Sequence, residues 1–127
     1  MAKRTVVKVP GIGGHRNPIP TCVTIGDLIL PSVISGHAPE GQESATDAEG
    51  QIAQAFVNMK NIVEAAGGSV DGIGKIVFYL KDFSHREIVN KHWLAMFPNE
   101  DDRPARHVLH GDLQANTWIQ MDVIAHK

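Results

Sequence analysis

Two amphipathic helical stretches, separated by one strongly apolar strand, are the feature that most limits how this chain can fold. Residues 46–66 carry apolar side chains at helical spacing, and so does the stretch that follows residue 84. Between them, residues 75–82 read KIVFYLKD, whose few polar residues predict a central strand. A chain with only two helices can cover one face of a sheet and leaves the other face open.

The ends of both helices are marked in the sequence. Thr46 with Glu49, and Ser84 with Glu87, have the spacing of a capping box and predict that the helices start there. Gly67-Gly68 and Pro98 predict where they end. The apolar stripe of the first helix consists of Ile52, Phe56, Met59, Val63 and Ala66, and that of the second consists of Val89, Trp93 and Met96.

The remaining strands are β-branched or alternating segments. Residues 5–9 predict a short strand, residues 10–20 a loop, and residues 21–35 a hairpin that turns at Gly26-Asp27. Residues 105–111 and 116–127 predict two final strands, which we expect to pair as a hairpin. The result is a single α+β domain over residues 1–127, with one mixed sheet of about six strands and two helices on one face.

In LILPSVI and TWIQMDVIA, apolar residues occupy both odd and even positions, so both faces of the sheet carry apolar side chains. The face without helices therefore also needs cover, which self-association would provide. The net charge of −2, with both signs scattered, gives no surface that would hold a nucleic acid by charge alone. One cysteine, Cys22, rules out an internal disulfide and fits a reducing compartment. With no membrane-length apolar run and no signal-peptide core, we expect a cytoplasmic protein.

The stretch DRPARHVLHG contains the strongest candidate for a binding residue, Arg106. A guanidinium can bind a carboxylate through two parallel hydrogen bonds, although Arg106 could equally pair with an acid on a neighbouring strand. His107 and His110, three residues apart on a strand, point to opposite faces and cannot chelate one ion. No Cys, His and Asp grouping elsewhere has zinc spacing, so we predict no metal site.

Several segments in this order resemble the Rid/YjgF family of reactive-intermediate deaminases. They are IVEAAGGSVDGIGKIVFYLKDF, IVNKHWLAMFP with Asn90, RPAR before a strand, and a last strand that ends VIAHK. The resemblance covers roughly residues 19–127. It implies a chorismate-mutase-like fold and a homotrimer with active sites between subunits. It also implies cofactor-independent hydrolysis of amino-acid-derived enamines or imines to keto acids and ammonia.

Within this resemblance, Arg106 matches the arginine that binds the substrate carboxylate. The resemblance also suggests that Arg106 lies opposite Asp122, Val108 opposite Gln120, and His110 opposite Trp118, with one face shared. We therefore expect Arg106 and Gln120 to be catalytic, and the substrate to contact Arg106, Ile19, Val33, Asn90, Val108 and His110.

The departures from the family pattern concern the same cleft. Ile19 replaces a usual tyrosine, Val33 follows Ser32 where the family has Ser-Gly (unless Ser35-Gly36 takes that place), and Gln120 replaces a usual glutamate. A glutamine can orient a water molecule but cannot act as a base. Asp122 or His110 could take over that role, and the loop with His15 and Asn17 could cover the site.

Two functions remain open from the sequence. The first is hydrolysis of a carboxylate-bearing imine or enamine with release of ammonia, in a catabolic pathway. The alternative is a non-catalytic trimer that senses a small carboxylate ligand. The expected partner is a small molecule, without nucleic acid, membrane, metal or cofactor.

Overall fold

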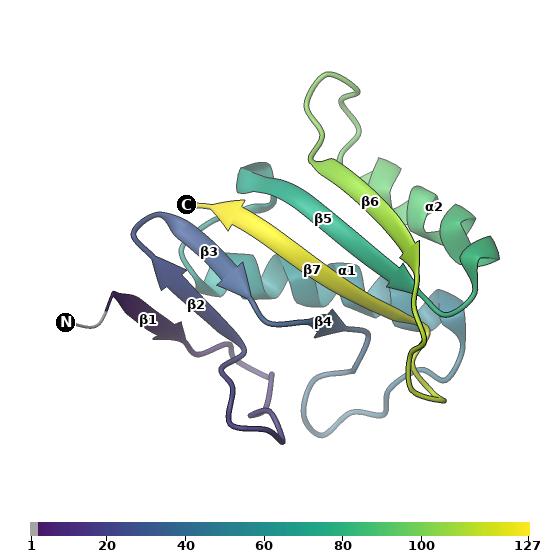
Figure 1. Ribbon diagram of the computed structural model, residues 1–127, viewed down its shortest axis with the longest axis horizontal. Coiled ribbons are helices and arrows are strands. Elements are labelled where there is room, and N and C mark those ends of the chain that lie inside the picture. Colours follow the sequence, from purple (N-terminus) through teal and green to yellow (C-terminus); the bar gives the residue numbers. More distant parts are fainter. Residues whose placement is uncertain (1–2) are drawn as a thin grey trace.

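One mixed sheet with two helices against it forms the domain in the computed structural model, which describes residues 3–127 (Figure 1). The helices are α1 (Ala48–Ala65) and α2 (Arg86–Met96), and short 3₁₀ turns span Val70–Gly72 and Phe83–His85. The strands are β1 (Arg4–Val7), β2 (Cys22–Ile25), β3 (Leu28–Pro31), β4 (Ile34–Ser35), β5 (Ile73–Leu80), β6 (Ala105–His110) and β7 (Ile119–His126).

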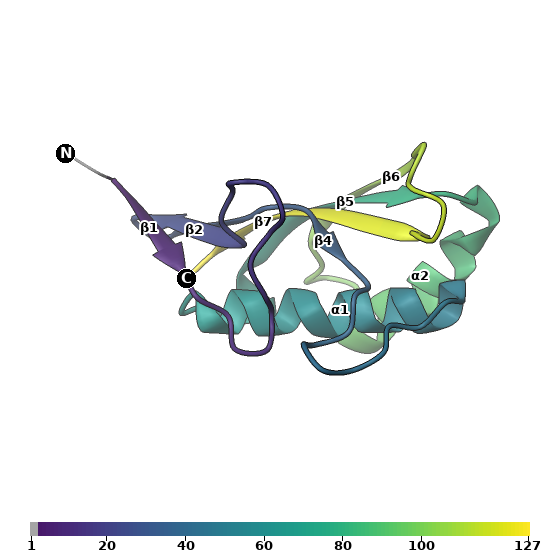
Figure 2. The same cartoon turned by 90° about the horizontal axis from the view of Figure 1, so that it is seen from below.

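The predicted fold class is confirmed. The sheet has 7 strands in the order β1-β2-β3-β7-β5-β6, and the two-residue β4, which the sequence did not predict, pairs with β7 beside β3. The hairpin of β2 and β3 turns at Gly26, whose φ of 56° is in the left-handed region that favours glycine. Both helices lie on the same side of the sheet, and no helix covers the other side (Figure 2).

The predicted hairpin of the last two strands is wrong. β5 lies between them, parallel to β6 and antiparallel to β7. The turn between β6 and β7 therefore crosses the end of β5, where Gly111 N–H donates to the Leu80 carbonyl (2.9 Å) and Lys81 N–H donates to the Trp118 carbonyl (3.2 Å). β5 is the long apolar strand, and its pairing on both edges satisfies its backbone polar groups within the core.

The alternation along β7 shows which face is packed. Ile119, Met121, Val123 and Ala125 point at the helices and are at most 2% exposed. They pack with Phe78 of β5 and with the apolar stripes of α1 and α2, which include Ile52, Met59, Val63, Val89 and Trp93. Gln120, Asp122, Ile124 and His126 alternate with the buried set and lie on the open face.

Neither predicted capping box forms. The N-cap of α1 is Asp47, without a side-chain hydrogen bond, and the carbonyl of Thr46 instead accepts from Trp118 Nε1 (2.9 Å). Ser84 lies in the 3₁₀ turn before α2, where its N–H donates to the Asp82 carboxylate (2.9 Å). A tertiary contact at Thr46 and a competing local acceptor at Asp82 replace the expected caps. The predicted end of α1 is confirmed, since Gly67 has φ of 93°.

Candidate anion-binding site at the edge of the sheet

The Arg106 side chain lies at the outer edge of the sheet, between β6 and α2. Its Nη2 donates to Asn90 Oδ1 at 2.6 Å. The guanidinium carbon lies 5.1 Å from the ring centroid of Trp93 and 5.8 Å from that of Phe78. An amide oxygen and an aromatic face therefore hold the guanidinium in a fixed orientation.

No carboxylate neutralises this charge. Among residues 3–127, Arg106 makes no ion pair, and Asn90 is its one side-chain hydrogen-bond partner. Burial lowers the pKa of Arg106, and the positive charge of Arg86 lowers it further. An arginine still stays cationic at neutral pH, so the half-buried guanidinium presents free N–H donors to an anion.

The expected pairing of Arg106 with Asp122 is wrong. Arg106 lies beside Ile76 of β5, which in turn lies beside Val123 of β7, and all three side chains are on the helix-covered side. Asp122 is level with Val77 and lies on the open face, as does Gln120. Within one chain, the structure therefore excludes a salt bridge between Arg106 and Asp122, and it does not bring Arg106 and Gln120 together.

The expected pairings of Val108 and His110 are also wrong. Val108 lies level with Phe78 and packs against the core, whereas His110 is exposed at the end of β6, level with Leu80. Trp118 instead makes an edge-to-face contact with His85, at 5.3 Å between ring centroids. Asn90 is the one predicted substrate contact that lies directly against Arg106.

The other predicted residues lie in the N-terminal half, away from β6. Ile19 and Val33 are 45% and 57% exposed. Ser32 Oγ donates to the Pro20 carbonyl (2.7 Å), while Ser35 hydrogen-bonds with His37 Nδ1 and lies beside Gln120 across β4 and β7.

The N-terminal loop does not reach Arg106 in the single chain. His15 Nδ1 accepts from the Asn17 N–H (3.0 Å), and His15 lines a cavity whose other lining residues do not include Arg106. In residues 3–127, no group of three or more His, Cys, Asp or Glu side chains is placed to hold a metal ion. Neither helix in the described part of the chain has the length and apolar character needed to cross a membrane.

Sequence reasoning missed the aromatic support of Arg106. Trp93 was predicted as part of the core-facing stripe of α2, and it is indeed only 7% exposed. The same ring also supports the guanidinium, because α2 packs beside the start of β6. The sequence does show that the strand with Arg106 follows the helix that carries Trp93. This order of elements does not specify which aromatic ring the guanidinium contacts.

Comparison with known proteins identifies the family. Residues 17–127 match the family described as Endoribonuclease L-PSP, and the chain belongs to that family. This match confirms the resemblance to the Rid/YjgF family, and structures of named Rid proteins share the fold of this chain. Membership is consistent with an enzyme that acts on small molecules, although some relatives carry names such as endoribonuclease or translation initiation inhibitor.

Individual relatives are distant in sequence but cover nearly the whole chain. A RutC family protein of Pyrococcus abyssi is 27% identical over 115 residues, which is 87% of each chain. RidA from an Antarctic Psychrobacter has a TM-score of 0.87 at 24% identity and covers 97% of this chain and 99% of its own. Escherichia coli TdcF with bound serine has a TM-score of 0.87 at 22% identity, covering 97% and 98%.

Proposed function

We propose that this protein hydrolyses the C=N bond of a small carboxylate-bearing imine, or of its enamine tautomer, to give a keto acid and ammonia. The observation that carries the proposal is the unpaired guanidinium of Arg106, fixed by Asn90 and Trp93. Nη2 is committed to Asn90, and the remaining N–H donors are available to the two oxygens of a substrate carboxylate.

The reaction needs placement more than strong bases. Water adds to the carbon of a protonated imine, so that a C–O bond forms and the nitrogen receives the C=N electron pair. One proton moves from the added water to the nitrogen, the C–N bond breaks and ammonia leaves, and the hydroxyl gives up its remaining proton to solvent as the C=O bond forms. Because a protonated imine is already a good electrophile, a neutral amide such as that of Gln120 can be sufficient to orient the water.

Arg106 and Gln120 are on opposite faces of one sheet, with β5 between their strands. Both residues can therefore serve one substrate only if they belong to different copies of the chain. We accordingly propose a homotrimer in which the substrate binds in clefts between subunits. The open sheet face with Gln120 would lie against the neighbouring copy.

The test is release of ammonia and keto acid from imines generated in situ from amino acids. A charge-assisted carboxylate contact is worth ~1.5–3 kcal/mol, so Arg106→Ala should lower kcat/KM by roughly 10- to 150-fold. Arg106→Lys keeps the charge but loses the planar fork, and should fall between the wild type and Arg106→Ala. Lys60→Ala, which removes an exposed cation on α1, away from the open sheet face, is the control and should leave the rate unchanged.

The alternative, a sensor of small carboxylates, is favoured by one observation: among residues 3–127, no acid accompanies Arg106. A sensor would give a thermal shift with keto acids that Arg106→Ala abolishes, without turnover of any imine. Turnover by the wild-type protein that is unaffected in Arg106→Ala would contradict the sensor and the role of Arg106 in binding the carboxylate, and absence of any turnover would contradict the hydrolase.

A further inference from the structure

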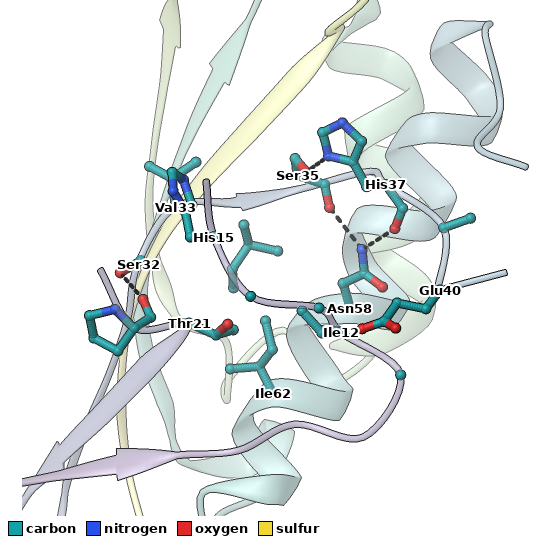
Figure 3. Close-up of a pocket in the computed structure, with 16 residues that line it drawn as sticks. Ile12, His15, Thr21, Ser32, Val33, Ser35, His37, Glu40, Asn58 and Ile62 are labelled. Carbon is teal, nitrogen blue, oxygen red and sulfur yellow. Dashed lines mark hydrogen bonds between the residues drawn. The ribbon is translucent and has the colours of Figure 1, made fainter. Parts of the chain in front are cut away.

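The cavity that His15 lines lies between the N-terminal loop, the segment from Ser32 to Ala38 and α1 (Figure 3). Its volume is about 290 Å³, which is large enough for a small organic molecule. Arg106 and Gln120 are not among the residues that line it, whereas Val33, an expected substrate contact, is. Unlike the proposed intersubunit cleft, this cavity is complete within one chain.

The wall next to α1 is held by fixed contacts. Asn58, which is 7% exposed, donates through Nδ2 to the carbonyls of Ser35 (2.9 Å) and His37 (2.8 Å). Gly36, between them, approaches α1 so closely that a Cβ would lie 2.2 Å from the Gln51 carbonyl oxygen. Because the backbone cannot shift here without losing these contacts, this wall is preformed.

The interior of the cavity is mainly apolar, with side chains that include Ile12, Ile34 and Ile62. The polar groups near α1 are already used. Ser35 and His37 hydrogen-bond with each other, and their carbonyls accept from Asn58. A ligand would therefore bury apolar surface against the isoleucines and find few unpaired groups on this wall.

The carboxylate of Glu40, by contrast, is available to a ligand. Glu40 is the one Asp, Glu, Lys or Arg residue among the residues that line the cavity. Its N–H donates to the Gly11 carbonyl (2.9 Å), and its side chain lies over Gly13, where a Cβ would be 2.7 Å from Oε1. Figure 3 shows the carboxylate directed back toward Ile12 and Asn58. Within residues 3–127, Glu40 has no ion-pair or side-chain hydrogen-bond partner.

We propose that this cavity binds a small apolar molecule that carries a protonated amine, with the ammonium group against Glu40 and the apolar part against Ile12, Ile34 and Ile62. Charge complementarity selects the amine, because the lining holds one carboxylate and no lysine or arginine. The preference is opposite in sign to that of Arg106. The protein thus has two small-molecule sites that discriminate by charge.

Three probes with the same ring separate charge from apolar burial: benzylamine, benzyl alcohol and benzoate. Titrations of the full chain, followed by amide chemical shifts, should show saturable binding of benzylamine with a Kd of roughly 0.1–1 mM. The shifts should be largest at residues 11–14 and 35–40. Benzyl alcohol should bind about 5- to 10-fold more weakly, as expected for loss of a solvent-exposed charge contact, and benzoate more weakly still.

Glu40→Gln should weaken benzylamine about 5- to 10-fold and leave benzyl alcohol unchanged. Glu43→Gln, which changes an exposed glutamate of the same loop outside the cavity, is the matched control and should change neither. Arg106→Ala should also leave benzylamine binding unchanged. Absence of saturable binding, equal affinity for benzoate, or equal benzylamine affinity in Glu40→Gln would each overturn the proposal.

Discussion

The two faces of strand β7 differ in how completely they are packed. On one face, Met121 and Val123 are at most 1% exposed and pack under the helices. On the other face, Gln120 is half-buried, and Asp122 and Ile124 are exposed. One strand therefore supplies both the centre of the core and the candidate water-positioning residue.

The open face is polar at some positions and apolar at others. Val6, Ile25, Leu28 and Ile124 lie on it and are between 38% and 53% exposed. Lys75 and Asp122 lie on the same face. A sheet face of this composition is incompletely packed in a single chain, which is why we expect a second copy to cover it. The comparison teaches that the helices cover one face of the sheet, whereas our proposal assigns the cover of the other face to a second copy of the chain.

The largest expected effect is on the packed face. Met121→Ala should lower the free energy of unfolding by ~2–5 kcal/mol, because it leaves a cavity between the sheet and α1. Leu94→Ala, at a position on α2 that is 52% exposed, is the control and should stay within ~0.5 kcal/mol of the wild type. Urea unfolding gives both values. A loss for Met121→Ala no larger than that of the control would show that the core is not centred on β7.

The second prediction concerns the open face. Light scattering should give about three times the chain mass of 13.8 kDa for the wild type. Ile124→Arg places a charge in the centre of that face and should shift the protein to monomers, because an unpaired charge is costly to bury. Leu94→Arg, on the helical side, should remain assembled. A wild-type monomer at micromolar concentration would remove the proposed intersubunit site.

The third prediction tests the role of Gln120. Gln120→Glu should raise the rate on simple amino-acid-derived imines by about 10-fold, since a carboxylate can accept a proton from the attacking water. The gain should disappear as the pH falls and the new carboxylate becomes protonated. The rate of Gln120→Glu on the native substrate should fall, because the new carboxylate would compete with the substrate carboxylate for Arg106 of the neighbouring copy.

Control variants separate Gln120 from the other candidates. Asp122→Asn and His110→Gln should leave the wild-type rate unchanged if Gln120 orients the water. A strong loss in either variant would transfer that role to Asp122 or His110.

The last prediction concerns Cys22, which is fully buried on the packed side of β2. Burial raises the pKa of its thiol. Thiol reagents should therefore modify folded Cys22 at least ~100-fold more slowly than the unfolded chain, and the rate should rise only at a higher pH than for an ordinary cysteine. Rapid modification near neutral pH would mean that the β2 edge of the packed face opens readily.

Local patterns in the sequence determined the elements and their inward faces. The stripe of Ile52, Met59 and Val63 identified the buried face of α1, and Gly26 and Gly67 marked a turn and a helix end. These features depend on neighbours within a few residues, through helical spacing and backbone conformation. Alternation also placed Arg106, Val108 and His110 correctly on one face of their strand.

Only the tertiary structure decided which strands are neighbours. The loop from β6 to β7 looked like a hairpin turn, but β5 lies between these strands and pairs with both, which encloses the long apolar strand on both edges. This strand order separates Arg106 from Asp122 and places Gln120 on the opposite face. The partners of the guanidinium are then Asn90 and Trp93. Such long-range contacts depend on the whole core, and no short segment of the sequence specifies them.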